Sequence, residues 1–357
     1  MSLGKIEKMK LLKGEIDVNN KKEKLPGIIL ARAFCCLGIV IFHYFCHSNG
    51  NFKFLFLTAN STFGFIFVTT FFNISGLVLY YNYPKVKSIK KFYYKRWKSI
   101  LLPYYICFFY FFLKTAFNNH KLFYKGKWPK IFINLVGLDG YLSYKFETYY
   151  LIGEWFLGAI IIIYILYPLL ILIITNCNII INNIIICLFY FLMYKKNFLN
   201  YGESRHIITC IMSFYFGIET IRFKKFYLTN KITFIISLLI FIFLSIFRVR
   251  IYCYILIFQI QGFSLFIILY QIGQYAMKKN MNTIFNEISN MSYSIYLFHH
   301  QIINDVLSIH NPREWYYHIF LLSIVFLLTF ICSKIHLLVV KSVYKSFIIK
   351  KLDSFFI

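Results

Sequence analysis

An arginine and a histidine lie inside one apolar stretch near the start of the chain, GIILARAFCCLGIVIFHYFCH at residues 27–47. Ten residues separate Arg32 from His43. At about 100° per residue a helix brings both side chains to one face, about 16 Å apart along its axis. An imidazole in such a place is suited to removing a proton from a hydroxyl group near neutral pH.

The position of Arg32 within the apolar stretch is the reason to consider a catalytic or binding role for this helix. An arginine at the middle of a membrane helix costs roughly 2.5 kcal/mol or more. We therefore expect the face shared by Arg32 and His43 to line a polar cavity. The alternative interpretation is that Arg32 extends to the lipid headgroups and that His43 is a neutral, hydrogen-bonded interior residue.

Two further segments carry residues of interest. Ser75 and Gly76 form a small-residue step in FGFIFVTTFFNISGLVLYY, which permits either close helix packing or the approach of a substrate. Arg96 and Lys98 precede Pro103 in KSIKKFYYKRWKSILLPYY. Such cations contact anionic lipid and set orientation, but a guanidinium also binds phosphate in a bidentate manner, and the pattern leaves both interpretations open.

The segment SNMSYSIYLFHHQ at 289–301 contains two adjacent histidines. Their side chains point about 100° apart on a helix, so we expect one of them at most to face a given cavity. His43 and His47 are spaced like metal ligands, but their helix offers no acidic or thiolate partner, and we predict no metal site. Glu219 is close enough in sequence to Arg222 to form an ion pair.

The elements that carry these residues are long apolar runs. The chain is 59% apolar and 15% charged over 357 residues, and the runs do not alternate as barrel strands do. We predict an all-α, polytopic membrane bundle of about ten helices. The expected spans are 26–46, 61–83, 100–117, 151–174, 179–194, 206–221, 232–247, 251–272, 288–307 and 316–340.

These spans form one transmembrane domain over 26–340, between polar tails at 1–25 and 341–357. Lysine and arginine are about twice as frequent on the side of the termini, which predicts that both termini are cytoplasmic. The net charge of +26 comes from short segments between the runs, so we expect a lipid bilayer and not nucleic acid as its partner. The nine cysteines form no CxxC pair and are expected to be free thiols.

Taken together, these segments resemble acyltransferase family three, the ten-span membrane O-acyltransferases of bacterial surface polysaccharides. The family carries a cation, ten residues and a histidine in its first span, as Arg32 and His43 do here. The other matching segments are FFNISG at 71–76, FYYKRWKSILLPYY at 92–105, EWFLGAIIIIYILYP at 154–168 and SYSIYLFH at 292–299. The last match selects His299 over His300.

The resemblance implies an enzyme of the bacterial inner membrane with no permanently bound cofactor. Its donor would be an acyl-CoA, most simply acetyl-CoA, and its acceptor a hydroxyl of a cell-surface or lipid-linked saccharide. His43 would be the base or a transient acyl carrier, and Arg32 would hold the donor. Where the family often has a second arginine this chain has Ser99, so Lys95 or Lys98 would assist Arg96 in donor binding.

The expected lining of the cavity is Ser75, Gly76, Glu154, Trp155, Tyr293 and His299. A second class of function also fits ten spans with intramembrane charge, namely a transporter or flippase for a polysaccharide precursor. The chain has no detectable inverted repeat and few acidic residues within spans, which disfavours an ion-coupled carrier. A structural subunit of an export complex would tolerate changes at both Arg32 and His43.

Overall fold

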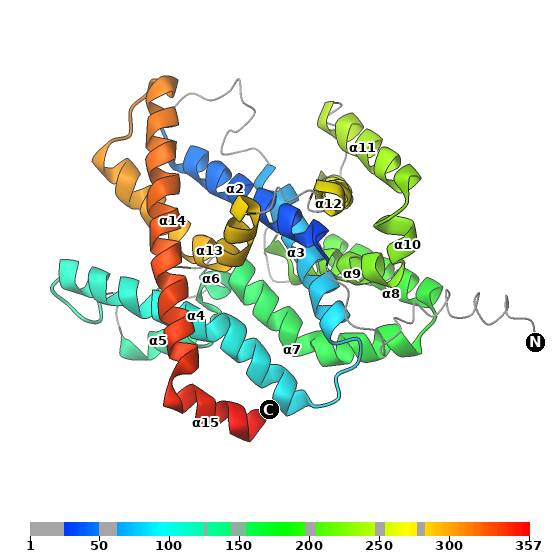
Figure 1. Cartoon of the computed structure of the whole chain (residues 1–357), viewed down its shortest axis with the longest axis horizontal. Helices are drawn as coiled ribbons and strands as arrows, with labels where there is room; N and C mark the ends of the chain where they lie inside the picture. The colour runs from blue at the N-terminus through cyan, green and yellow to red at the C-terminus, as the bar shows by residue number, and fades with distance from the viewer. Residues whose placement is uncertain are drawn as a thin grey trace, which may run out of the picture. The chain divides into compact units, whose positions relative to one another are not determined.

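The computed structural model describes residues 25–49, 63–124, 127–143, 149, 152, 155–196, 205–246, 254–276 and 283–357. Within these ranges the chain is helical and contains no β-strand, which confirms the all-α class (Figure 1). The eight cysteines in these ranges are free thiols, as expected.

Every predicted span coincides with a helix of at least 16 residues. These helices are α2 (Gly27–His47), α3 (Phe63–Asn82), α4 (Ile89–Asn118), α7 (Trp155–Asn176), α8 (Ile179–Lys196), α9 (Ile207–Arg222), α11 (Lys231–Ile246), α12 (Tyr254–Ala276), α13 (Thr283–Ile309) and α14 (Trp315–Lys345). Shorter helices are η2 (Trp128–Lys130), α5 (Ile131–Leu135), α6 (Asp139–Leu142), α10 (Lys224–Tyr227) and α15 (Phe347–Phe356).

Six of the long helices, α2, α3, α4, α7, α12 and α14, are long and apolar enough to cross a membrane. Each can bridge a hydrocarbon core of about 30 Å at 1.5 Å per residue. Helices α8 and α11 are apolar but shorter. In the described residues, six helices therefore have the length and composition of membrane spans.

The chain divides into two compact units. The first comprises residues 1–35, 62–86 and 166–289, and the second comprises 36–61, 87–165 and 290–357. Helices α2, α7 and α13 each contribute residues to both units.

In the first unit, α3 and α9 pack with their backbones in contact. A Cβ atom added to Gly76 would lie 1.9 Å from the carbonyl oxygen of Phe214, and one added to Gly217 would lie 2.0 Å from that of Asn73. No side chain fits at either point, so small residues are what allow the approach. The α3 helix also binds α12, because Thr70 Oγ1 donates to the carbonyl oxygen of Gly262 at 3.0 Å.

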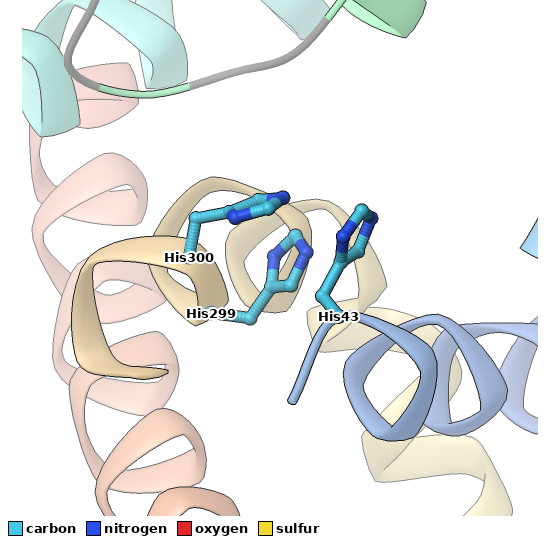
Figure 2. A group of neighbouring side chains, drawn as sticks. All are labelled: His43, His299 and His300. Carbon is cyan, nitrogen blue, oxygen red and sulfur yellow. The ribbon is translucent and has the colours of Figure 1, made fainter. Parts of the chain in front are cut away.

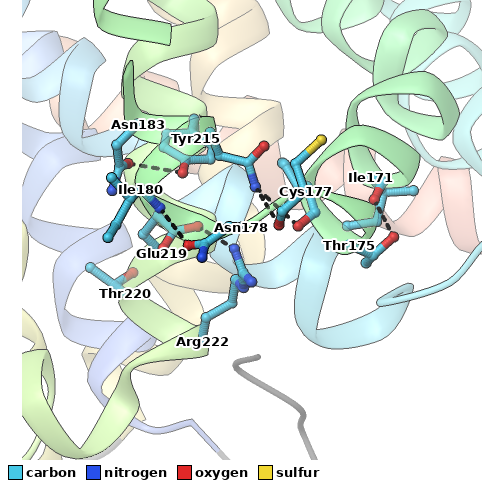
Figure 3. A network of polar contacts seen from close by, with 12 residues as sticks. Ile171, Thr175, Cys177, Asn178, Ile180, Asn183, Tyr215, Glu219, Thr220 and Arg222 are labelled. Carbon is cyan, nitrogen blue, oxygen red and sulfur yellow. Dashed lines mark hydrogen bonds and ion pairs between the residues drawn. The ribbon is translucent and has the colours of Figure 1, made fainter. Parts of the chain in front are cut away.

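A buried ion pair lies at the end of α9 (Figure 3). Arg222 Nη1 donates to Glu219 Oε1 at 2.7 Å, and their side chains are only 3% and 8% exposed. This confirms the pair expected from the sequence. One turn earlier, Tyr215 donates its hydroxyl to Asn183 Oδ1 of α8 at 2.9 Å. Pairing keeps both charges tolerable in an apolar surrounding.

In the second unit, tyrosine hydroxyls donate hydrogen bonds to backbone carbonyls just before a proline inside a helix. Pro103 of α4 has no N–H and disturbs the helical bonds of the preceding turn. Tyr344 donates to the Lys98 carbonyl at 2.6 Å, and Tyr293 donates to the Ile100 carbonyl at 2.9 Å. These two hydrogen bonds join the residues just before Pro103 to α14 and α13.

The same device recurs on α7, which contains Pro168. Tyr93 of α4 donates its hydroxyl at 2.7 Å to the carbonyl oxygen of Ile165, three residues before that proline. In each of the two helices, the carbonyl oxygen three residues before the proline therefore accepts a hydrogen bond from a tyrosine of another helix.

A buried carboxyl group lies at the start of α6, against α4 and α5. Asp139 is 1% exposed and accepts hydrogen bonds from the Tyr104 hydroxyl at 3.1 Å and from Asn134 Nδ2 at 2.9 Å. Burial raises the pKa of Asp139 to about 7, and the hydrogen bonds oppose this only in part. Nothing in the sequence singled this residue out.

Candidate functional site

Three histidines from two helices converge in the second unit (Figure 2). The ring of His43 on α2 lies 5.3 Å from that of His299 and 4.1 Å from that of His300, both on α13. The rings of His299 and His300 are themselves 4.5 Å apart. His43 and His300 are half-buried, whereas His299 is 1% exposed.

We expected at most one of the two adjacent histidines to face a given cavity, but the rings of both lie close to that of His43. Their Cβ directions do diverge by about 100° around α13. Both imidazoles nevertheless turn toward the ring of His43 (Figure 2). His300 therefore belongs to the site together with His299.

The hydrogen bonds of His299 define its tautomer. Its Nδ1 lies 3.1 Å from the carbonyl oxygen of Ile295 and 2.7 Å from that of Tyr296. A carbonyl oxygen only accepts, so Nδ1 carries the proton. The lone pair of the neutral ring is then on Nε2.

The part of α2 that carries His43 is anchored by the residues beside it. Cys36, Val40 and Tyr44 follow one another at four-residue steps and are at most 3% exposed. His318 Nε2 donates to the carbonyl oxygen of Pro312 at 2.9 Å, so its Nδ1 accepts the Tyr44 hydroxyl at 2.8 Å. The backbone next to His43 is thus fixed by a buried hydrogen bond.

Arg32 lies on the same helix and is half-buried. The helix is continuous from Gly27 to His47, so the register that puts Arg32 and His43 on one face is kept. Arg32 belongs to the first unit and His43 to the second. A cavity that both side chains line stays a prediction.

The basic segment is helical, because α4 begins at Ile89, well before the expected start at residue 100. Ser88 caps it by accepting a hydrogen bond from the Lys91 backbone N–H at 3.3 Å. The Arg96 guanidinium lies over the rings of Phe92 and Tyr164, at 5.9 and 5.8 Å. Stacking of this kind holds the cation in place at modest cost.

Lys98 is engaged by the end of the same chain. Its Nζ lies 2.6 Å from Asp353 Oδ2 on α15, and the Tyr94 hydroxyl donates to Asp353 Oδ1 at 2.8 Å. These two donors lower the pKa of Asp353. Tyr94 also stacks on Phe356, with ring centroids 4.7 Å apart. The predicted tail at 341–357 therefore contains a helix that covers part of the basic segment.

The remaining predicted site residues are dispersed. Lys95 is half-buried on α4, and Trp155 is half-buried at the start of α7. Ser75 is half-buried on α3 beside Gly76, whose position is filled by the backbone of α9. The hydroxyl of Tyr293 is used in the bond to α4 described above. Glu154 lies outside the described residues.

Sequence reasoning did not find three residues that the structure brings into view, namely His300, Asp139 and Asp353. The sequence did contain a sign that His300 is a candidate site residue, because it adjoins His299 in an apolar span. The partners of the two aspartates, Tyr104 and Lys98, lie 35 and 255 residues away in the chain.

Comparison with known proteins gives one finding. A family model described as an acyltransferase domain, that of acyltransferase family 3, matches residues 25–334, which run from the start of α2 into α14. No curated protein and no solved structure gives a significant match.

Proposed function

The chain belongs to acyltransferase family 3, and from that premise we propose that it transfers an acyl group from acyl-CoA to a hydroxyl of a saccharide. Acetyl is the simplest acyl group, and the acceptor is a cell-surface or lipid-linked sugar. Its membrane is the bacterial inner membrane, with both termini in the cytoplasm, as the excess of cations on that side favours.

The observation that carries this proposal is the imidazole of His43, half-buried among other imidazoles in an apolar bundle. A sugar hydroxyl is a weak nucleophile until a base takes its proton in the transition state. His43 takes that proton while the oxygen attacks the thioester carbonyl. The C–O bond forms, the C–S bond breaks, and the proton passes from His43 to the departing thiolate.

A second route through the same residue differs in order. His43 attacks the thioester first and carries the acyl group as an acyl-imidazole, which the sugar hydroxyl then attacks. This route requires ping-pong kinetics, whereas direct transfer requires both substrates to be bound together.

The donor is held by cations in this proposal. Arg32, three turns before His43, binds the donor's phosphates or its carbonyl oxygen. Arg96 binds coenzyme phosphates with help from Lys95 or Lys98. Lys98 is paired with Asp353, so the donor competes with that carboxylate for it.

The test is acyl transfer from labelled acetyl-CoA by the purified full chain in detergent. His43→Ala is expected to lower kcat by about 10²–10⁴-fold at a normal protein level. His310→Ala, at an exposed histidine that follows α13, is the matched control and retains activity. Activity of His43→Ala near that of the wild type would remove His43 from the mechanism.

The donor assignments have their own tests. Arg96→Ala is expected to raise the KM for the donor more than it lowers kcat, and the reverse would indicate a role in the chemical step. Arg32→Lys is expected to keep part of the activity that Arg32→Ala loses. The acceptor is identified by comparing, by mass, the surface glycans of a deletion strain with those of its parent. Unchanged glycans would refute the saccharide acceptor.

A further inference from the structure

The three histidines form a cluster that offers only imidazole nitrogens. One ring nitrogen from each of His43, His299 and His300 lies within 4.8 Å of the other two. Nothing in the acyl-transfer chemistry proposed above needs three imidazoles together. We propose that this cluster binds one divalent transition-metal ion, preferably Zn²⁺, and that binding reversibly blocks acyl transfer.

The spacing is close to that of a bound site. Zinc binds histidine at about 2.0–2.1 Å in tetrahedral geometry, which places the ligating nitrogens about 3.3 Å apart. Nitrogens that start within 4.8 Å reach this separation by small rotations of the three side chains. The rings already turn toward one another in the structure (Figure 2).

The environment of His299 favours ligation. A histidine that binds metal donates its other ring N–H to a carbonyl or carboxylate, which fixes the ring and raises its basicity. His299 makes this contact, with Nδ1 pointing at the carbonyl oxygens of Ile295 and Tyr296. Its Nε2 is thereby left as the ligating atom.

The imidazole nitrogens of the cluster determine which metals it can bind. Imidazole suits zinc, copper, nickel and cobalt, whereas magnesium and calcium require oxygen ligands. Three histidines leave a fourth tetrahedral position for water or for another ligand. His47, exposed at the end of α2, has its ring 5.5 Å from that of His300 and is a candidate for that position.

The effect on activity rests on the proposed function, but the binding does not. A metal ion occupies the lone pair with which His43 would accept the acceptor's proton. Metal and proton also compete for all three imidazoles, so affinity falls as the pH drops below the ordinary histidine range. The titratable rings near His43 or one another in the described residues include those of His47, His299 and His300, and the Tyr296 ring lies 6.1 Å from that of His299.

Binding is measured first, without reference to activity. The full chain, purified in detergent without a histidine tag, is titrated with Zn²⁺ against a chromophoric chelator, with metal content read by mass spectrometry. We expect one ion per chain. His299→Ala and His300→Ala should each weaken binding at least tenfold, while His310→Ala should bind as the wild type does. His300→Gln serves if an alanine variant does not fold as a monodisperse protein.

Failure of binding overturns the metal site and leaves the proposed function intact. Binding that His299→Ala and His310→Ala weaken equally also overturns it, since the ion is then adventitious. Activity is measured next, in Zn²⁺ and again after a chelator. Inhibition that the chelator reverses, and that His299→Ala relieves, supports the proposal.

Two other results separate the ideas. Stoichiometric binding with undiminished acyl transfer would keep the metal site but refute both the inhibition and the role of His43 as base. Activity that is absent without metal and restored by Zn²⁺ would overturn the inhibition and require a metal-assisted reaction.

Discussion

The buried carboxyl group of Asp139 gives the sharpest stability prediction. Its pKa is raised from 3.8 to about 7 by burial. Between these values the folded chain holds a proton that the unfolded chain has lost, so the contribution of Asp139 to stability falls as the pH rises through that range. It is fully present below pH 3.8 and lost above pH 7.

The size of the effect follows from the shift. Three pKa units at about 1.4 kcal/mol each give about 4 kcal/mol, as an upper value. Asp139→Asn removes the ionisation and keeps a side chain of similar shape. The difference in melting temperature, variant minus wild type, should therefore rise between pH 4 and pH 8. Comparing the two proteins cancels the titration of the other groups.

Thermal unfolding of the purified full chain at several pH values measures this difference. Glu314→Gln is the control, because Glu314 is exposed and lies outside the expected spans. Its difference from the wild type should change little with pH, since burial is what perturbs the ionisation of Asp139. A difference for Asp139→Asn that is constant across the range would refute the reasoning.

Three further changes test other contacts. Asp353→Asn releases Lys98 and should lower the donor KM several-fold at constant kcat; a raised KM would show that α15 supports the donor site. Gly76→Ala places a Cβ atom 1.9 Å from the Phe214 carbonyl oxygen and should destabilise the chain by about 1–3 kcal/mol. Thermal unfolding measures this, and an unchanged stability would contradict the packing of α3 on α9. Tyr293→Phe removes a hydrogen bond to α4 and should cost about 1 kcal/mol, whereas an unchanged melting temperature would mean that this bond is dispensable.

Much of the fold can be predicted from the sequence, because an apolar run long enough to cross a bilayer has few alternatives to a helix. Each of the ten expected spans coincides with a helix in the described residues, but only six of these helices are long and apolar enough to cross a membrane. The helix that contains the expected span 100–117 begins earlier, at Ile89, because Ser88 caps a helix that continues through the lysines of the basic segment.

The site was predictable only where its residues share a helix. The spacing of Arg32 and His43 is a property of one helix, and the continuous α2 preserves it. The approach of His300 to His43 depends on where α13 lies, which no spacing reveals. The pairing of Lys98 with Asp353 likewise joins residues 255 positions apart.

Three tyrosines that hydrogen-bond to the proline-containing helices affect how tyrosine-to-phenylalanine exchanges in this chain should be judged. The hydroxyls of three tyrosines each donate a hydrogen bond to a main-chain carbonyl of another helix, namely those of Tyr93, Tyr293 and Tyr344. Exchange of tyrosine for phenylalanine is ordinarily counted as mild. At these three positions it removes a hydrogen bond between two helices, so its effect should extend to the packing of the helix that supplies the carbonyl.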